Sequence, residues 1–333
     1  MDLEAFLAEW YNDSPTVLVH TSGSTGEPKP LLVEKRRMEA SAHITCSFLG
    51  LREGDTALLC LPLDYIAGKM MVVRSLTCGL RLLAVSPSGN PLETMTEHID
   101  FAAMVPLQVW NTLQVSEERE RLMQIRHLII GGGAIDDRLA QALAAFPNNV
   151  WSTYGMTETL SHIALRRLNG PDCSEWYTPF DGVCVSVNAD GCLVINAPAV
   201  HDGPLVTNDI AELQLPSQSE RAGREFLRFR ILGRKDNVIC SGGVKIQIEE
   251  VESLLRRRVR VPYIITKAPD ERLGEQVVML TESADIAALQ NICREVLPKY
   301  WQPRRILTVN RLPLTATGKP ARAEAMRIAA AMV

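Results

Sequence analysis

Short apolar runs alternate with longer amphipathic stretches in the first 232 residues of the chain. Apolar runs of this length are typical of buried strands, and the stretches between them are typical of helices. Strands that alternate with helices predict an α/β fold in which crossover connections join the strands. We expect strands at 58–61, 82–85, 102–105, 127–130 and 150–153.

The pattern changes at Val183. Two strand-like runs, 183–187 and 192–195, flank the turn 188–191 and predict a β-hairpin. Beyond Gly233 the sequence predicts a second, smaller α+β unit, and the absence of a Pro/Gly-rich linker predicts a short joint between the two units. Its expected helices are 249–258 and 286–297, and its expected strands are 263–266, 276–280 and 305–309.

A segment rich in hydroxyl groups and glycine, residues 21–29, follows the apolar run 16–20. Its glycines let the backbone approach an anion closely, and its hydroxyl, N–H and lysine groups can donate to one. It is not a Walker A motif, because Pro28 stands where that motif needs glycine. It predicts a site for nucleotide phosphate, although taken alone it is also compatible with a surface turn. The residues that we expect to bind phosphate are Thr21, Ser22, Gly23, Ser24, Thr25, Gly26 and Lys29.

The composition is that of an ordinary globular chain, with 333 residues, 46% hydrophobic and 22% charged. The acidic N-terminus does not resemble a signal peptide, and no apolar run reaches the roughly 18–20 residues of a membrane span. We therefore expect a cytoplasmic protein without a membrane span. The 8 cysteines are scattered, without CxxC pairs or histidines at metal-ligand spacing. They predict small buried side chains in a reducing compartment, and neither zinc nor disulfides.

The net charge of −4 is distributed unevenly. After residue 236 there are 15 Lys and Arg against 10 Asp and Glu, a net charge of +5, which leaves −9 for the first 236 residues. A basic unit facing an acidic one suits closure on a phosphate-rich ligand. The run Arg256-Arg257-Arg258 is equally compatible with the solvated end of a helix. Neither unit has the basic excess and interleaved aromatic residues of a nucleic-acid surface, so we expect no nucleic-acid partner.

Further segments rich in glycine, hydroxyl groups and charge follow the phosphate loop. They are YGMTET at 154–159, TND at 207–209, GRKDN at 233–237, SGG at 241–243 and TGK at 317–319. In this order and spacing they resemble the signature segments of the adenylate-forming superfamily, which includes acyl-CoA synthetases, luciferases and adenylation domains. The resemblance covers nearly the whole chain. It is closest to the o-succinylbenzoate–CoA ligases of menaquinone biosynthesis, because of residues 154–162 and the compact length.

The resemblance implies an α/β fold with two lobes. The large N-terminal lobe would hold parallel-rich sheets flanked by helices and a small β subdomain, and the smaller α+β C-terminal lobe would be mobile. We place the ATP- and acid-binding lobe at 1–233, the hinge at 234–236 and the mobile lobe at 237–333. Superfamily members usually have a much longer stretch before the phosphate loop, so we expect an N-terminal subdomain to be missing. A homodimer would cover apolar surface exposed in this way.

The resemblance also implies that the chain joins a carboxylic acid to coenzyme A through an acyl-AMP. Transfer from ATP requires donors, cations and Mg²⁺ around a charge-rich phosphorus centre. Thr157 is implied as a donor to the α-phosphate, Glu158 as the Mg²⁺ ligand and Lys319 as the bridge between the acid and the α-phosphate. The alternatives are a helix N-cap for Thr157, a helix-dipole partner for Glu158 and an exposed surface side chain for Lys319.

Adenine needs a flat apolar slot with backbone hydrogen bonds. Gly131, Gly132 and Gly133 follow an expected strand and permit close backbone approach, and Tyr154, beside Gly155, offers a ring for stacking. A Rossmann dinucleotide fingerprint is excluded, because an aspartate occupies position 136 where that motif needs Gly or Ala.

The ribose hydroxyls match the carboxylate of Asp209, with Arg234 as a second partner. The alternative for Asp209 is a local turn bond. Asp236 occupies the hinge position of the superfamily, where a few torsion changes would swing the small lobe. After that swing, the expected strand containing Ser241, Gly242 and Gly243 would approach the CoA tunnel.

The acyl pocket is implied at residues 62–69, with Tyr65 at a position that is often aromatic in the superfamily. An o-succinylbenzoate-like acid has a second carboxylate, which needs a cation or several donors once it is desolvated. Lys69, Arg74, Ser161 and His162 are the candidates. The alternatives are that the two cations are exposed on a helix and that the histidine is structural.

Two other functions remain open from the sequence. One is an acyl-AMP ligase that loads a carrier-protein thiol and ignores free CoA, and the other is a catalytically degenerate nucleotide-binding protein. The intact Lys319, Glu158 and Asp209 favour an enzyme. We therefore expect an acid–CoA ligase that uses ATP, Mg²⁺ and coenzyme A, with o-succinylbenzoate as the leading acid.

Overall fold

A seven-stranded sheet forms the centre of the N-terminal lobe in the computed structural model, which describes residues 1–20, 30–133, 135–214, 227–315 and 319–333. Its first five strands are parallel to one another, the sixth is antiparallel to the fifth, and the seventh is antiparallel to the sixth. All five strands expected from apolar runs are present. In spatial order the sheet contains β4 (Arg81–Ala84), β3 (Thr56–Leu59), β5 (Phe101–Met104), β6 (His127–Ile130), β7 (Asn149–Gly155), β8 (His162–Arg167) and β9 (Thr178–Pro179).

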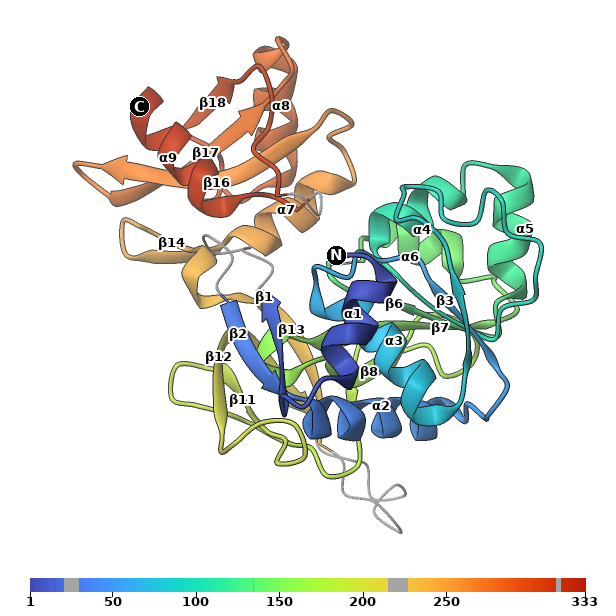
Figure 1. The fold of residues 1–333 in the computed structure, drawn as a ribbon. Helices are drawn as coiled ribbons and strands as arrows, with labels where there is room; N and C mark the ends of the chain where they lie inside the picture. Colours follow the sequence, from blue (N-terminus) through green and yellow to red (C-terminus); the bar gives the residue numbers. More distant parts are fainter. Residues whose placement is uncertain (21–29, 134, 215–226, 316–318) are drawn as a thin grey trace.

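Six α-helices accompany this sheet among the described residues. The first begins after Asp2, whose carboxylate accepts the N–H of Ala5 at 2.8 Å, and it buries Phe6 and Trp10. It lies beside α3, and α3 packs against α2 (Figure 1). The helices are α1 (Leu3–Tyr11), α2 (Lys35–Leu49), α3 (Ile66–Cys78), α4 (Pro106–Thr112), α5 (Ser116–Gln124) and α6 (Asp137–Leu143).

Two antiparallel β units complete the N-terminal lobe. The pair β1 (Thr16–His20) and β2 (Pro30–Glu34) flanks the expected phosphate loop, which lies outside the described residues. The expected hairpin is confirmed as β10 and β11. The four-stranded sheet contains β10 (Cys184–Val187), β11 (Cys192–Asn196), β12 (Leu205–Gln214) and β13 (Arg228–Arg234).

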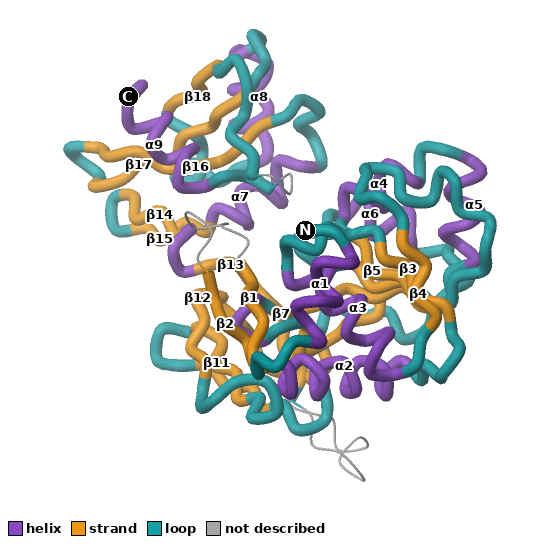
Figure 2. The backbone as a smooth tube through the Cα atoms, in the orientation of Figure 1, coloured by secondary structure: helices purple, strands orange, loops and turns teal. Residues whose placement is uncertain are grey.

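The C-terminal lobe has a five-stranded sheet with its own buried cores, and the short helix η2 (Lys235–Asn237) connects it to β13. Figure 2 shows this lobe as a separate group of strands and helices. The expected helices and strands are all present. The elements are β14 (Val238–Ser241), β15 (Val244–Gln247), α7 (Ile248–Arg256), β16 (Tyr263–Asp270), β17 (Gly274–Thr281), α8 (Ile286–Val296), β18 (Arg305–Thr308) and α9 (Arg322–Met332).

The strand expected to contain Ser241, Gly242 and Gly243 ends earlier than predicted. Strand β14 ends at Ser241, which pairs with Val244. Gly242 and Gly243 between them have φ values of 57° and 83°. Two consecutive residues with positive φ form the tight turn of a β-hairpin, a conformation that glycine adopts without strain. Local turn geometry therefore explains both glycines.

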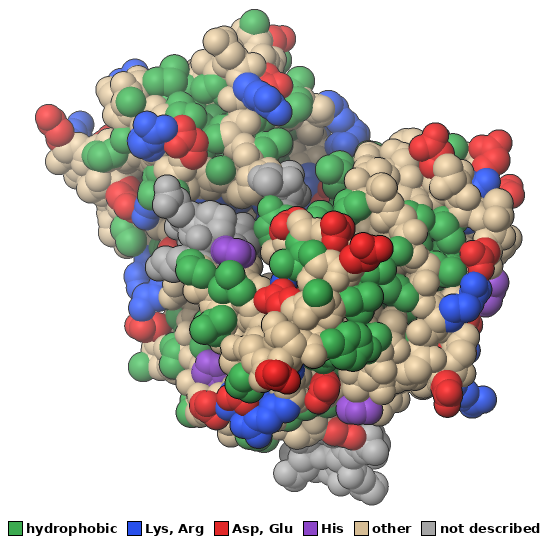
Figure 3. All heavy atoms as spheres, in the orientation of Figure 1, with side chains coloured by type: hydrophobic (Ala, Val, Ile, Leu, Met, Phe, Trp, Pro, Cys, Tyr) green, Lys and Arg blue, Asp and Glu red, His purple; other side chains and the backbone are tan. Residues whose placement is uncertain are grey.

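The lobes touch through charged residues of α6 and of the C-terminal end of α7. Arg138 donates to the carbonyl of Arg256 at 3.3 Å, and Arg257 lies 3.5 Å from Asp137. The run Arg256-Arg257-Arg258 thus lies at the end of a helix, which was one of the two interpretations given for it. This end of the helix also faces the N-terminal lobe. In Figure 3 acidic side chains gather over α1, where Asp2 and Glu4 are exposed. Within the described ranges, no helix combines the length and apolarity needed to cross a membrane.

Candidate functional site

Lys319 of the C-terminal lobe lies against the glycine segment that follows β6. A Cβ added to Gly133 would be 3.8 Å from Cε of Lys319. Lys319 itself is held by Thr315, whose N–H donates to the Lys319 carbonyl at 2.7 Å and whose hydroxyl accepts the Lys319 N–H at 3.1 Å. Burial and the nearby Arg234 lower the pKa of Lys319. The lysine is therefore not an exposed surface side chain, and its charge faces the N-terminal lobe.

The glycine segment itself has little room for side chains. A Cβ on Gly131 would come within 2.4 Å of Oγ1 of Thr153, and Gly132 has a φ of 76°. Packing against Thr153 at position 131 and the positive φ at position 132 therefore require glycine.

Asp209 collects two donors from different strands. Its Oδ2 accepts the hydroxyl of Tyr154 at 2.6 Å, and its Oδ1 accepts Nη1 of Arg234 at 3.1 Å. The register of β12 and β13 sets Asp209 opposite Arg234. Since Asp209 lies within a strand, the turn alternative is wrong. The structure thus brings together the three side chains that the sequence assigned to the nucleoside.

The ring of Tyr154 is part of an aromatic cluster. Its centroid is 5.0 Å from that of Phe229 and 5.8 Å from that of Tyr177. Burial, followed by the charge of Asp209, raises the pKa of Tyr154, so its hydroxyl stays a donor at neutral pH. Gly155 follows, and a Cβ there would lie 2.3 Å from the carbonyl oxygen of Ser161. Only glycine permits this close packing of β7 against residues 161–162.

A short turn, η1 (Thr157–Thr159), follows Gly155. Its N-cap is Met156, so the N-cap alternative for Thr157 is wrong; Thr157 is buried, whereas Glu158 is exposed. Glu158 is in the first turn of this helix, as it would be if it interacted with a helix dipole. A helix of three residues, however, has only a small dipole. In the described part of the chain no group of three or more His, Cys, Asp and Glu side chains is arranged to hold a metal ion. A single carboxylate fits Mg²⁺, because this ion usually takes its other ligands from phosphate and water.

Arg234 also links the residues at the joint between the two lobes. Arg234 donates to Asp209 on β12 and, through Nε and Nη2, to Asp236 in η2. Its backbone carbonyl accepts Nε2 of Gln247 at 3.0 Å. The expected hinge residue is therefore tied to the candidate ribose site in this arrangement of the lobes. The hairpin tip at Gly242 instead contacts Leu273 of its own lobe.

Four polar side chains meet beside η1 and form what we call the Arg74 cluster. Nη2 of Arg74 donates to the Ser161 hydroxyl at 2.6 Å, and this hydroxyl lies 3.1 Å from Nδ1 of His162. The other ring nitrogen of His162 lies 3.2 Å from Oγ1 of Thr45 on α2. Burial and then Arg74 lower the pKa of His162 well below its usual value, so the imidazole is neutral at pH 7.

Arg74 lacks an anionic partner in the part of the chain that the structure describes. Its side chain is only 2% exposed, and its Nε has no hydrogen-bond partner. Burial lowers the pKa of Arg74 to about 10, which leaves the guanidinium charged at neutral pH. The alternative in which this cation is exposed on a helix is therefore wrong.

Lys69, also buried, is not part of the Arg74 cluster. Its Nζ lies 3.1 Å from a carboxylate oxygen of Glu9 on α1 and 4.9 Å from the ring centroid of Phe6. Its charge is therefore already paired. Tyr65 precedes α3 and forms a β-bridge with His20, so it lies where β1 enters the expected phosphate loop. Residues 21–29 themselves, and Thr317 and Gly318, lie outside the described residues.

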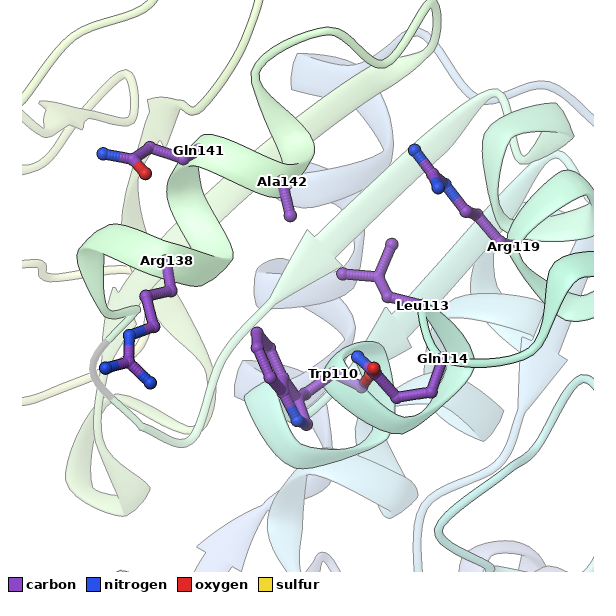
Figure 4. Close-up of a pocket in the computed structure, with 7 residues that line it drawn as sticks. All are labelled: Trp110, Leu113, Gln114, Arg119, Arg138, Gln141 and Ala142. Carbon is purple, nitrogen blue, oxygen red and sulfur yellow. The ribbon is translucent and has the colours of Figure 1, made fainter. Parts of the chain in front are cut away.

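A hollow elsewhere on the N-terminal lobe contains none of the residues singled out by the sequence. It has a volume of about 400 Å³ and lies between α4, α5 and α6 (Figure 4). Trp110, Arg119 and Arg138 are among the side chains around it. It is separate from the Arg74 cluster, which is buried.

Sequence reasoning missed Thr45 and Glu9. Thr45 lies on the face of α2 that also buries Ser41, Ala42 and Leu49, and a polar residue on such a face is a recognisable signal. Glu9 gave no such signal, since a carboxylate on a short surface helix is common.

Known proteins resemble this chain along nearly its whole length. The family model described as AMP-binding enzyme matches residues 6–189. A 2-succinylbenzoate–CoA ligase of Bacillus mycoides is 27% identical, over 98% of this chain and 73% of the relative. An acyl-CoA synthetase (AMP-forming)/AMP-acid ligase II-like protein of Dyadobacter fermentans is 32% identical with a TM-score of 0.63, over 96% of this chain and 91% of that one. A substituted form of E. coli MenE with bound OSB-AMS is 25% identical with a TM-score of 0.73, over 96% and 70%.

Proposed function

Since the chain belongs to the AMP-binding enzyme family and is an acid–thiol ligase of the AMP-forming type, we propose that it ligates o-succinylbenzoate to coenzyme A. The acid carboxylate would attack the α-phosphate of ATP and release pyrophosphate. The CoA thiol would then attack the acyl carbon and release AMP. The names of the relatives support this choice of acid, and the Arg74 cluster supports it independently.

The observation that carries the proposal is the buried guanidinium of Arg74, which has no anionic partner among the residues that the structure describes. A buried charge without a counter-charge is costly, so a site of this kind favours a ligand that supplies one. The second carboxylate of an aromatic diacid would do so, with Ser161 and neutral His162 beside it as further hydrogen-bonding groups. Because Ser161 packs on Gly155, this end of the acid would lie one short turn from Thr157.

The remaining assignments follow the geometry of the two lobes. Asp209 and Arg234 would bind the ribose, and the glycine segment with Tyr154 would bind adenine. Lys319 would bridge the acid and the α-phosphate. We assign these roles to a nucleotide- and acid-binding lobe at 1–233, a hinge at 234–236 and a mobile lobe at 237–333.

Two roles depend on ligands and on lobe movement. Mg²⁺ held by Glu158 and the phosphates would neutralise the charge of the departing pyrophosphate. The hairpin tip at 241–243 would reach the CoA path only after the small lobe rotates.

A screen of acids for AMP release tests the proposal. We expect o-succinylbenzoate to support AMP release that depends on coenzyme A, and benzoate, 4-phenyl-4-oxobutanoate and fatty acids to support far less. A preference for one of these monoacids would contradict the assigned substrate. Pyrophosphate exchange with transfer only to a carrier protein would indicate the alternative ligase, and ATP binding without exchange for any acid would indicate a degenerate site.

A further inference from the structure

Two cysteines on the packed helices α2 and α3 lie near each other beside the Arg74 cluster. Cys46 is on α2, one turn after His43, and Cys78, the last residue of α3, packs against the buried cluster that contains Cys46. Cys46 is buried, whereas Cys78 is half-exposed and its Sγ lies 4.0 Å from Nδ1 of the exposed His43. A small reagent can therefore reach the Cys78 thiol, whereas the Cys46 thiol is shielded from solvent. The scattered spacing of cysteines in the sequence hid this pair, because its members lie on different helices.

We propose that Cys46 and Cys78 are a modification site that forms a reversible disulfide by exchange with low-molecular-weight disulfides. The Cys78 thiolate attacks one sulfur of the small disulfide, forms a mixed disulfide and releases one small thiolate. The Cys46 sulfur then attacks Cys78 and releases the second small thiolate, which takes up the proton from Cys46. The two protein thiols are oxidised, and one small disulfide is reduced to two thiols.

The surroundings support Cys78 as the attacking thiol. Its interaction with Cys46, together with the positive charge of Arg74, lowers the pKa of Cys78 despite burial. The C-terminal end of the α3 dipole opposes this shift, so proximity contributes more than acidity to the reactivity of the pair. The interaction with Cys78, followed by burial, raises the pKa of Cys46, so Cys46 is not the thiol that attacks first.

The disulfide would act on the acid site through both helices. Arg74 is one helical turn before Cys78, and Cys46 follows Thr45, which contacts His162. A disulfide would join α2 to α3 covalently next to Thr45 and one helical turn from Arg74, and so would restrict both helices that carry the cluster. The effect on acid binding rests on the proposed function, whereas the disulfide does not.

Thiol mapping of the intact protein tests the disulfide without any activity assay. The protein is equilibrated with mixtures of oxidised and reduced glutathione, alkylated and analysed by peptide mass spectrometry. We expect a Cys46–Cys78 linkage that dithiothreitol reverses and that also forms in Cys173→Ser, a control that removes one of the exposed cysteines outside the pair. In Cys46→Ser we expect Cys78 to stop at the mixed disulfide with glutathione. Wild-type protein in which both thiols stay reduced, or in which Cys78 stops at the mixed disulfide, would overturn the proposal.

A kinetic comparison tests the link to the acid site. We expect the oxidised protein to have a kcat/KM for the acid about tenfold lower than the reduced protein, with recovery on reduction. Cys46→Ser, which cannot form the linkage, should keep its kcat/KM under conditions that fully oxidise the wild type. An unchanged kcat/KM in protein that carries the mapped linkage would overturn this link and leave the disulfide itself established.

Discussion

Arg234 donates two parallel hydrogen bonds to Asp236, from Nε and from Nη2, each 2.9 Å long. The same guanidinium donates to Asp209, the candidate ribose residue on the other side of the joint between the lobes. The hydrogen bonds with Asp236 contribute most to raising the pKa of Arg234. Rotation of the C-terminal lobe about residue 236 must therefore alter this shared contact.

Asp236→Pro should separate the two half-reactions. Proline fixes φ near about −65°, a value typical of the short helix that holds residue 236 here. Because Lys319 already faces the N-terminal lobe in this arrangement, we expect pyrophosphate exchange to persist and thioester formation to fall by at least about tenfold. Asp236→Ala is the matched control, since it removes the carboxylate and leaves the backbone free. Normal overall turnover in the proline variant would place the hinge elsewhere.

Lys319→Ala should impair adenylation selectively. Loss of a positioned charge in the transition state lowers the rate by about 10²–10³-fold. Thioester formation from preformed acyl-AMP should change little, and both steps can be followed in single-turnover experiments. Lys299→Ala, at an exposed position of the same lobe, serves as the control. Equal losses in the two steps would be incompatible with the assigned role.

Glu9→Gln should destabilise the N-terminal lobe. It leaves the buried Lys69 without a carboxylate, although glutamine can still accept the N–H of Leu18 as Glu9 does. We expect a loss of about 2 kcal/mol in the free energy of unfolding, measured in urea. The double variant Glu9→Gln/Lys69→Met should recover part of it, and Glu4→Gln in the same helix should have little effect. Identical midpoints for Glu9→Gln and wild type would refute the pairing.

Stability should depend on the protonation of His127. Burial, and then the charges of Arg126 and Arg167, lower the pKa of His127 from 6.5 to about 4. Between these two pKa values the unfolded chain binds a proton at this residue that the native protein does not bind. The contribution of His127 to the free energy of unfolding is therefore fully present above pH 6.5 and is lost as the pH falls toward 4. Because the ring is only partly buried, we expect a loss of about 1–2 kcal/mol. His127→Asn should lack this loss and His201→Asn should retain it; equal pH profiles for wild type and His127→Asn would contradict the assignment.

Local sequence pattern predicted the strands well and the tight turn at 242–243 poorly. Strand β1 begins and ends where the apolar run 16–20 does, because alternation of buried and exposed positions is a local property. The tip at 242–243 was assigned to a strand because two glycines carry no periodic signal. Its turn geometry is visible only once Ser241 pairs with Val244.

The sequence named most of the Arg74 cluster without predicting its burial. Whether a cation on a helix faces solvent depends on what packs around that helix, which a single sequence does not show. A signal was nevertheless present in α3, because the four apolar residues 70–73 lie between Lys69 and Arg74 and cover all sides of the helix. Such a run indicates that this part of the helix is buried, although it does not show whether the flanking cations are. The partner of each cation could not be predicted, since Glu9 and Ser161 come from distant parts of the chain.

The most direct test of the account is the ratio of kcat/KM for o-succinylbenzoate to that for 4-phenyl-4-oxobutanoate, which lacks the second carboxylate. Arg74→Gln removes the charge that we assign to this carboxylate. The ratio should therefore fall by about 30- to 1,000-fold, which corresponds to a loss of about 2–4 kcal/mol in the free energy of discrimination between the two acids. The affinity for ATP should stay nearly constant. Lys69→Met, which removes a buried cation that is already paired, should leave the ratio unchanged. A ratio that is the same in Arg74→Gln and wild type, with both proteins folded, would contradict the central claim.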